Sequence, residues 1–223
     1  MKILVTGSSS GIGKEATKRY LELGHEVYGF DLLDSDIHDD KYHHYVLDIK
    51  DKDSLPDIKD IEVIFNNAGL QNSENDIDNN LKGTINVTEK YISLSSSLKS
   101  ILFNASSSAT SGQEFPMYTA SKAGLLGYMR NVAIRLAKIG VVVNSISFGG
   151  VETDLNKPVM EDKELWNKIM AVTPLKKWTT LKEAGDWIIF LTLTNKSMSG
   201  QDIIVDNGEK DLNPTFVWPE YTL

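Results

Sequence analysis

A tyrosine and a lysine stand four residues apart in the stretch YTASK, at Tyr118 and Lys122. On a helix, positions i and i+4 share one face, with Cβ atoms roughly 5–6 Å apart. An ammonium about 4 Å from a phenolate stabilises it by roughly 4 kcal/mol at an effective dielectric of about 20. This energy would lower the tyrosine pKa by up to about three units before burial opposes it. The spacing therefore suggests a general acid and base, although an ordinary surface pair has the same spacing.

Three glycines, Gly7, Gly11 and Gly13, separate an apolar stretch from a helical pattern in VTGSSSGIGKEA. Such a turn brings backbone N–H groups against a pyrophosphate at a helix N-terminus, where the dipole also favours negative charge. Side chains would block that approach. The TGxxxGxG spacing differs from the GxGxxG fingerprint, and a glycine-rich turn without a ligand is the alternative.

Asp31 indicates which dinucleotide the turn would bind. It ends an apolar stretch 20 residues beyond Gly11, where a carboxylate can accept hydrogen bonds from the ribose hydroxyls of the adenosine and would repel a 2′-phosphate. Ser10, rather than a lysine or arginine, precedes Gly11. The pattern predicts NAD(H) rather than NADP(H); a solvated aspartate at a strand end is the alternative.

Apolar stretches alternate with helical patterns along the chain, and no linker or repeat interrupts them. This alternation predicts an α/β fold, with a parallel sheet covered on both faces, in a single domain over residues 1–223. Strands are expected at 2–6, 26–31, 45–48, 63–66, 100–106, 141–146 and 202–206, and helices at 11–23, 76–98, 117–138 and 181–193.

Two segments lack a clear period. Residues 32–44 contain His38, His43 and His44, but surface loops often have this composition and no metal site is predicted. Residues 150–175, interrupted by Pro158 and Pro174, are expected to form a substrate-binding loop or lid.

Composition excludes several classes of function. The net charge of −8 argues against a basic nucleic-acid surface. No apolar run approaches the roughly 18 residues that span a membrane, and the N-terminal MKILVTG lacks the features of a secretion signal. The chain has no cysteine, which fits a reducing compartment. A cytoplasmic protein without nucleic-acid or membrane partners is expected.

Eight short motifs, in order and at element boundaries, make the chain resemble the short-chain dehydrogenases/reductases over nearly its whole length. The resemblance implies a Rossmann-type, doubly wound parallel sheet in three α/β/α layers. The motifs are TGSSSGIG (6–13), Asp48, NNAG (66–69), NLKG (80–83), NASS (104–107), YTASK (118–122), NSISFGG (144–150) and SGQDIIVDNG (199–208).

The resemblance implies catalytic roles for four side chains. Tyr118 would be the general acid and base, and Lys122 would assist it and hold the nicotinamide ribose. Asn80 would belong to a proton relay. Ser107 would orient the substrate carbonyl, with Ser106 as the second choice and Ser108 behind it; Ser107 lies 11 residues before Tyr118, where many relatives have 13.

The resemblance also implies an NAD-binding set spread over five motifs. Its expected members are Gly7, Ser9, Ser10, Gly11, Ile12, Gly13, Asp31, Asp48, Ile49, Asn67, Ala68, Gly69, Tyr118, Lys122, Gly149, Val151 and Thr153.

Some segments depart from the family pattern. The crossover between the second and third strands is too short for its usual helix, and Phe148 replaces the proline that usually precedes the GG pair. Phe148 is expected either to contact the nicotinamide or to fill the gap that the proline leaves.

The expected function is an NAD-dependent interconversion of a secondary alcohol and a ketone, on a 3-oxoacyl, steroid-like or small carbonyl substrate. The alternative is a non-catalytic, NAD-binding redox sensor or scaffold. An epimerase would need a larger C-terminal domain. A homodimer or homotetramer is expected, with the apolar side chains of the tail at 213–223 covering this chain's site or a neighbour's.

Overall fold

Seven parallel strands form one sheet in the order β3-β2-β1-β4-β5-β6-β7. The computed structural model describes residues 1–212; the tail at 213–223, with its expected covering role, lies outside the described residues. The strands are β1 (Lys2–Thr6), β2 (Glu26–Asp31), β3 (Tyr42–Val46), β4 (Val63–Asn66), β5 (Ser100–Asn104), β6 (Val142–Phe148) and β7 (Asp202–Val205).

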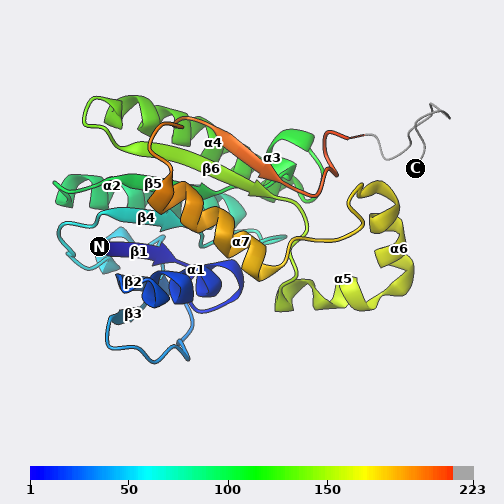
Figure 1. Ribbon diagram of the computed structural model, residues 1–223, viewed down its shortest axis with the longest axis horizontal. Coiled ribbons are helices and arrows are strands. Elements are labelled where there is room, and N and C mark those ends of the chain that lie inside the picture. The colour runs from blue at the N-terminus through cyan, green and yellow to red at the C-terminus, as the bar shows by residue number, and fades with distance from the viewer. Residues whose placement is uncertain (213–223) are drawn as a thin grey trace.

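Helices cover both faces of this sheet, which gives the expected three-layer, Rossmann-type arrangement (Figure 1). The long helices are α1 (Gly11–Glu22), α2 (Thr84–Leu94), α4 (Pro116–Ala137), α6 (Lys163–Val172) and α7 (Leu181–Ile189). The short ones are η1 (Lys52–Ser54), η2 (Ile77–Gly83), α3 (Ser108–Ser111), η3 (Asp154–Asn156), α5 (Lys157–Glu161) and η4 (Phe190–Thr194). None of the helices within residues 1–212 is long and apolar enough to cross a membrane.

The side chains of β1 show how one strand supplies two cores. Successive residues of a strand point to opposite faces, so Ile3 and Val5 pack with α1 and α7, while Leu4 packs with α2 and α4. All three are fully buried. Burial on both faces explains why the central strands read as continuous apolar runs.

The chain changes direction at β1. β1 pairs with β2 on one side and with β4 on the other, so the connections after β1 and after β4 run to opposite sides. In open α/β sheets, ligands bind at this switch point, beside the carboxyl ends of the strands. The motifs at the ends of β1, β4 and β5 are therefore brought to one edge.

Strand β3 corrects the expected strand at 45–48. It begins at Tyr42, because Val27 of β2 pairs with Tyr42 and the register runs on to Asp31 with Val46. As the edge strand it is only half-buried, so its YHHYV sequence needs no apolar run. The preceding connection contains no helix between Asp31 and Tyr42, as the short crossover predicts.

The helix expected at 76–98 is divided and shorter. Residues Ile77–Gly83 form a π-helical segment, and α2 follows and ends at Leu94. At Ser95 the backbone becomes extended, and the Ser95 hydroxyl donates to the carbonyl of Ile61. The Ser95 side chain thus bonds a carbonyl outside the helix, at the point where α2 has ended.

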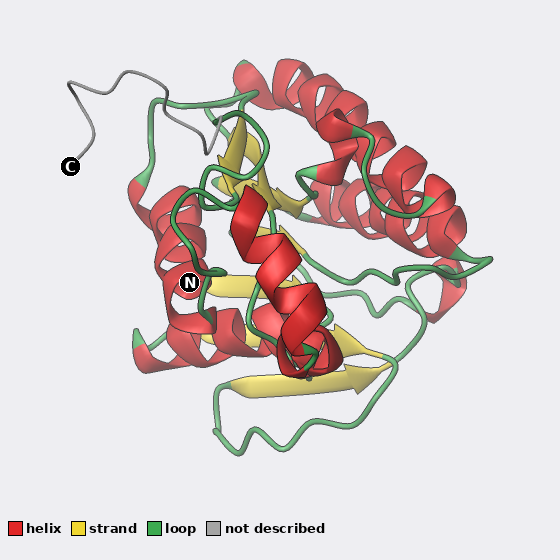
Figure 2. Cartoon of the chain, turned by 90° about the vertical axis from the view of Figure 1, so that its right-hand side faces the viewer, coloured by secondary structure: helices red, strands yellow, loops and turns green. Residues whose placement is uncertain are grey.

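The expected lid at 150–175 is largely helical. Asp162 caps α6, because its Oδ1 accepts from the backbone N–H groups of Glu164 and Leu165. The helices α5 and α6 bury no side chain completely, although Leu165, Trp166, Ile169 and Met170 of α6 recur at helical spacing in the sequence. They stand away from the sheet in Figure 1 and lie in front of it in Figure 2.

Candidate active site

The glycine turn after β1 is closed too tightly for side chains. Gly7 and Gly11 have φ of +68° and +49°, in the left-handed region that glycine adopts readily. A Cβ on Gly13 would lie 2.0 Å from the Gly7 carbonyl oxygen. Ser10 has extended backbone at the N-cap of α1, so the turn leads directly to a helix N-terminus.

Asp31 lies against this turn. Its Oδ2 accepts from the backbone N–H of Ser9 at 2.9 Å, and its Oδ1 accepts from that of Leu33 at 3.0 Å. A carboxylate has about four lone-pair sites, so both oxygens can accept further hydrogen bonds. Ile12, one residue into the helix after Gly11, packs against the core below.

Two asparagines join the turn to the next strands. Asn67 Nδ2 donates to the carbonyls of Thr6 and Gly7 at 3.1 and 3.2 Å, and its Oδ1 accepts from Asn104 at 2.9 Å. Thr6 Oγ1 also accepts from the backbone N–H groups of Asn67 and Ala68. The ends of β1, β4 and β5 are thus held in register.

Asp48 and Ile49 lie after β3 and differ in exposure. Asp48 Oδ1 accepts from the backbone of Lys50 at 2.9 Å. Ile49 is buried against Gly83, where a Cβ would lie 2.7 Å from Ile49 Cγ1. The Ile49 side chain therefore supports the helix, which leaves Asp48 as the polar side chain of the pair.

Asn80 holds the loop that follows β4. Its Oδ1 accepts from the backbone N–H of Leu70 at 2.7 Å, and its Nδ2 donates to the Leu70 carbonyl at 2.8 Å. Nδ2 also donates to Ser121 Oγ at 3.0 Å. Asn80 sits in the π-helical segment, a distortion found often at functional sites.

Tyr118 and Lys122 share one face of α4, as their spacing predicts. Lys122 Nζ lies 5.6 Å from the centre of the Tyr118 ring and donates to the Asn104 carbonyl at 2.7 Å. Lys122 is 4% exposed, and burial lowers the pKa of its ammonium to about 8.

The expected fall in the Tyr118 pKa is not what the structure shows. Burial is the main cause that raises the pKa of Tyr118 to about 12, and the carboxylates of Glu114 and Asp76 contribute to the rise. Hydrogen bonding by the Ser106 side chain acts in the opposite direction. Desolvation of the phenolate therefore outweighs the ammonium, which lies over the ring rather than beside the phenol oxygen.

The structure places Ser106, rather than Ser107, against Tyr118. Ser106 is 5% exposed, and its Oγ accepts from the hydroxyl of Ser108 at 2.9 Å. Ser107 instead lies directly before α3, at its N-cap position, where its N–H donates to the Phe148 carbonyl at 3.0 Å. Counting from the strand end selects Ser107, but the tight turn into α3 brings Ser106 inward.

This difference predicts unequal effects of two alanine substitutions. Ser106→Ala should lower kcat/KM by about 100-fold, since it removes a positioned hydrogen-bond donor. Ser107→Ala, the matched control one residue away, should keep a kcat/KM close to that of the unsubstituted protein. Steady-state kinetics of both variants measure the difference, and a larger loss in Ser107→Ala would restore the choice made by counting.

The segment after β6 lies over the glycine turn. Thr153 Cγ2 is 3.6 Å from where a Cβ of Gly11 would stand. Gly149 packs on Asp206, and Val151 is buried and bridges to Thr179. Gly149, Val151 and Thr153 were expected in the cofactor-binding set. The chain that contains them runs from the end of β6 towards α1.

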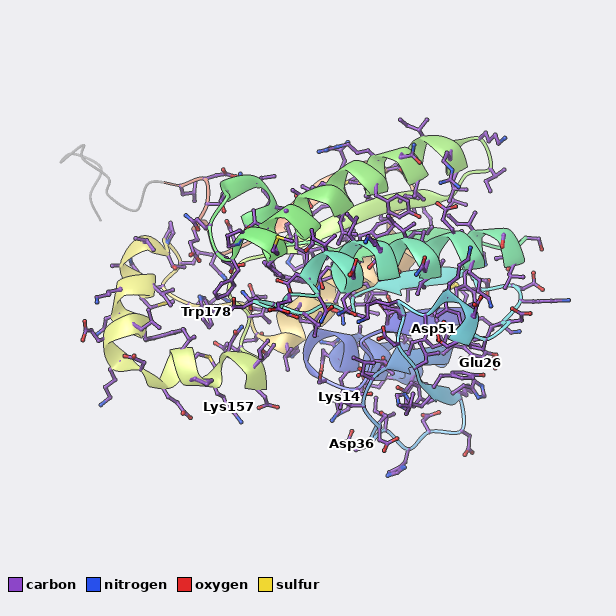
Figure 3. All side chains as sticks on the ribbon, turned by 180° about the vertical axis from the view of Figure 1, so that it is seen from behind. Lys14, Glu26, Asp36, Asp51, Lys157 and Trp178 are labelled. Atoms are coloured by element: carbon purple, nitrogen blue, oxygen red, sulfur yellow. The ribbon has the colours of Figure 1, made fainter. Side chains whose placement is uncertain are left out.

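Phe148 and Trp178 are large side chains that fill space beside the GG pair after β6. Phe148 is 5% exposed and belongs to the core cluster under α1 and α7, which favours the gap-filling interpretation of this residue. Trp178 occupies the space where Gly150 would carry a Cβ, and its ring meets Trp166 of α6 at 5.0 Å (Figure 3). In the sequence, only the size of the Trp178 side chain indicates that it packs in this way.

Two of the three histidines of the 32–44 segment, His43 and His44, lie in β3 and contact neighbouring protein groups. His43 Nε2 lies 2.9 Å from Glu26, and His44 contacts Tyr42 and the Leu33 carbonyl. Across residues 1–212, no group of three or more His, Asp or Glu side chains is arranged to hold a metal ion.

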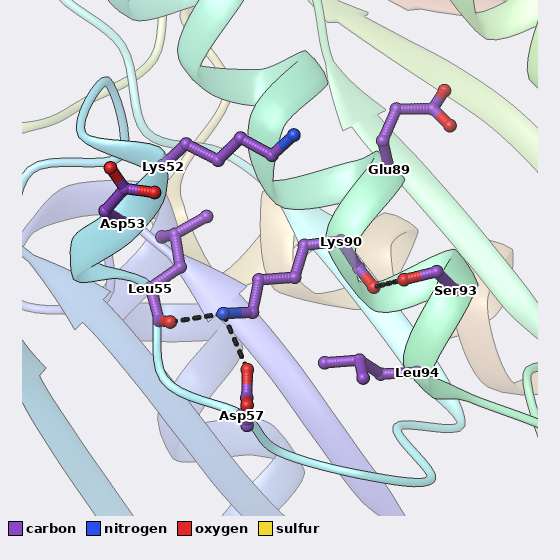
Figure 4. Close-up of a pocket in the computed structure, with 8 residues that line it drawn as sticks. All are labelled: Lys52, Asp53, Leu55, Asp57, Glu89, Lys90, Ser93 and Leu94. Atoms are coloured by element: carbon purple, nitrogen blue, oxygen red, sulfur yellow. Dashed lines mark hydrogen bonds and ion pairs between the residues drawn. The ribbon is translucent and has the colours of Figure 1, made fainter.

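A cavity of about 670 Å³ lies elsewhere, between η1 and α2. Its lining shares no residue with the Tyr118 site. Lys90 crosses it to reach the Leu55 carbonyl and Asp57 (Figure 4). A second cavity of about 290 Å³ lies beside the glycine turn, between α1 and the lid, and is lined by Gly11, Lys14, Thr153 and Lys157 among others.

Comparisons with known proteins agree with this arrangement. A family model described as Enoyl-(Acyl carrier protein) reductase matches residues 7–210. The chain is 29% identical over 238 residues to the 3-oxoacyl-[acyl-carrier-protein] reductase FabG of Buchnera aphidicola, covering 92% of this chain and 95% of that protein. It is 28% identical over 240 residues to short-chain dehydrogenase reductase 5 of Arabidopsis thaliana, covering 92% and 93%.

Solved structures share the fold. A 4-hydroxyisoleucine dehydrogenase complexed with NADH has a TM-score of 0.84 at 22% identity, covering 95% of this chain and 99% of that one. A proposed 2-deoxy-D-gluconate 3-dehydrogenase from Agrobacterium tumefaciens, with bound NADP, has a TM-score of 0.83 at 24% identity, covering 93% and 95%. The family model matches residues 7–210, which is most of this chain. The chain therefore belongs to the short-chain dehydrogenase/reductase family of oxidoreductases.

Proposed function

We propose that this protein interconverts a secondary alcohol and a ketone, with NAD(H) as its preferred cofactor. The observation that carries the proposal is the Tyr118–Lys122 pair at the carboxyl edge of the sheet, in which Lys122 is buried and Tyr118 partly buried, with the buried Ser106 beside it. In the family resemblance, these residue types handle the proton of a carbonyl reduction.

The residues present fit a nicotinamide dinucleotide. The glycine turn excludes side chains where a pyrophosphate would approach the start of α1. Asp31 has lone pairs for ribose hydroxyls. When bound, the nicotinamide supplies or accepts the hydride; the protein orients the substrate and manages the proton.

Each catalytic side chain has one task in this proposal. Tyr118 donates its proton to the carbonyl oxygen in reduction and accepts it in oxidation. Ser106 hydrogen-bonds the same oxygen and orients it, while Lys122 holds the nicotinamide ribose. Asn80 fixes Leu70 and Ser121 around the pair. Because the pKa of Tyr118 is raised to about 12, the phenol is protonated near neutrality and ready to reduce a ketone.

The preference for NAD(H) rests on charge. The Asp31 carboxylate would repel a 2′-phosphate. Lys14, on the first turn of α1, pairs with Asp36 at 2.7 Å, and this carboxylate partly offsets its charge (Figure 3). The related structures contain NADH in one case and NADP in another. The preference is therefore inferred from Asp31 and Lys14 of this chain.

The proposal is tested by turnover. Purified protein is incubated with NADH or NADPH and a panel of ketones, including 3-oxoacyl thioesters, steroid ketones and small sugars, and cofactor absorbance is followed at 340 nm. Oxidation of NADH by at least one ketone class is expected. Tight NADH binding without turnover on any of them would favour the alternative, a redox sensor or scaffold.

Assembly as a homodimer or homotetramer stays a prediction. The outer face of α4 offers the exposed Ile134 beside the open surface of Gly127. Sedimentation at micromolar concentration would measure the assembly, and a monomer would contradict the prediction.

A further inference from the structure

A tyrosine of the edge strand β3 reaches the glycine turn through a gap in the strand that lies between them. The Tyr42 hydroxyl donates to Ser8 Oγ at 2.9 Å, and Ser8, directly after Gly7, is fully buried. The gap is Gly29 of β2, because a Cβ there would lie 2.4 Å from both Ser8 Oγ and the Tyr42 hydroxyl oxygen. Any larger residue at position 29 would therefore separate the two hydroxyl groups.

His44, two residues further along β3 and on the same side of the sheet, connects Tyr42 with the loop after β2. Its Nδ1 lies 3.0 Å from the Tyr42 hydroxyl, and its Nε2 donates to the Leu33 carbonyl at 2.9 Å. The Ser9 hydroxyl donates to the same carbonyl at 3.1 Å. The backbone N–H groups of Ser9 and Leu33 in turn hold the two carboxylate oxygens of Asp31. The Tyr42–His44 pair thus contacts both the glycine turn and the loop that positions Asp31.

This loop has few other means of support. No helix lies between Asp31 and Tyr42, and Leu32 and Leu33, the residues next to Asp31, are 55% and 64% exposed. Apolar burial therefore does not hold these two side chains in place. The Tyr42 ring, in contrast, packs against the core cluster under α1 and α7, so its hydroxyl is a fixed point from which the turn and the loop can be held.

We propose that Tyr42 and His44 are positioning residues for the adenosine half of the cofactor. They act through the Ser8 hydroxyl and the Leu33 carbonyl, and they fix the turn and the Asp31 loop in the arrangement that accepts the phosphates and the ribose. The inference rests on the proposed function, which assigns these cofactor groups to the glycine turn and to Asp31. Without the phenol oxygen, a smaller fraction of molecules holds that arrangement, and the apparent affinity falls in proportion to the fraction.

The test is the binding of NADH and of 5′-AMP to Tyr42→Phe. This substitution keeps the ring in the core and removes only the hydroxyl. The Kd for each ligand should rise by about fivefold to tenfold, the range for the loss of one buried hydrogen bond. The two factors should agree, because 5′-AMP carries a phosphate and the ribose hydroxyls. Nicotinamide fluorescence measures the Kd for NADH, and displacement of NADH measures that for 5′-AMP.

The opposite face of the sheet supplies matched controls. The Tyr28 hydroxyl donates to Glu26 at 2.7 Å, and the Tyr28 side chain packs with the other core cluster, so Tyr28→Phe should leave both Kd values unchanged. His44→Leu should weaken both ligands by about twofold to fivefold, since its bond to the carbonyl is exposed and worth less. His43→Leu, one residue away on the Glu26 side, should have no effect.

A double-mutant cycle distinguishes positioning through Ser8 from a general loosening of the fold. Ser8→Ala removes the other end of the hydrogen bond. If the effect passes through this bond, the double variant should bind NADH no more weakly than the weaker of the two single variants, whereas independent losses multiply. Multiplied losses would overturn the proposal. On any ketone that is turned over, Tyr42→Phe should raise the KM for NADH and leave kcat at saturating NADH unchanged.

The cofactor-free protein gives a readout that needs no ligand. The amide hydrogen of Ser9 should exchange with solvent faster in Tyr42→Phe than in Tyr28→Phe or the unsubstituted protein. Unchanged exchange together with unchanged Kd values in Tyr42→Phe would overturn the proposal and leave the proposed function intact. An unsubstituted protein that binds neither NADH nor NADPH would instead contradict the proposed function, and this inference with it.

Discussion

Tyr118→Phe is expected to lower turnover by roughly 10³-fold, within the range for loss of a general acid–base group. The phenyl ring keeps the packing on α4, and Lys122 keeps its bond to the Asn104 carbonyl, so NADH should bind nearly as before. The loss should therefore fall on kcat, with little change in the Kd for NADH. Stopped-flow turnover and nicotinamide fluorescence measure the two quantities separately.

A matched control lies on the same helix. Tyr128 donates to Glu89 at 2.8 Å, away from the reacting pair, so Tyr128→Phe removes the same atom without touching the proposed chemistry. Its thermal stability should fall slightly, and its kcat should stay close to that of the unsubstituted protein. Turnover retained in Tyr118→Phe would remove Tyr118 from the mechanism and leave the proposed function without its proton donor.

The sheet is predictable from the sequence because its central strands are buried on both faces. Runs such as KILVT and VIFN read as strands on apolar content alone, and β1 and β4 occupy those residues. The edge strand β3 does not, since half of its surface meets solvent and its pairing with β2 fixes its start. Local pattern therefore defines the interior of this fold better than its edge.

In the candidate site too, the features set by local geometry are predictable from the sequence, and those set by tertiary packing are not. Spacing is enough to place Tyr118 and Lys122 on one helical face, because helical geometry is local. The Tyr118 pKa was expected to fall and instead rises, because desolvation depends on everything packed around the phenol. Ser106 replaces Ser107 because a short helix turns the chain after β5.

Replacing Asp31 should change the cofactor preference more than any other single substitution near the glycine turn. At about 5 Å and an effective dielectric of about 20, a carboxylate repels each phosphate charge by roughly 3 kcal/mol. After screening by salt, Asp31→Asn should shift the ratio of the NADPH and NADH dissociation constants by about 100-fold towards NADPH, at about 1.4 kcal/mol per tenfold. Parallel fluorescence titrations with the two cofactors measure the ratio.

The design of this experiment must separate charge from loop structure. Asp31 accepts from the backbones of Ser9 and Leu33, and an asparagine can replace only one of these acceptors, so Asp31→Asn should also weaken NADH binding somewhat. The ratio is therefore the relevant quantity, because a loosened loop affects both cofactors alike. Asp40→Asn, at an exposed position of the same connection, should leave the ratio unchanged. A ratio that stays constant in Asp31→Asn would mean that Asp31 does not select the cofactor. The preference would then have to come from other charges around the turn. Lys14 and its partner Asp36 would be the next pair to vary.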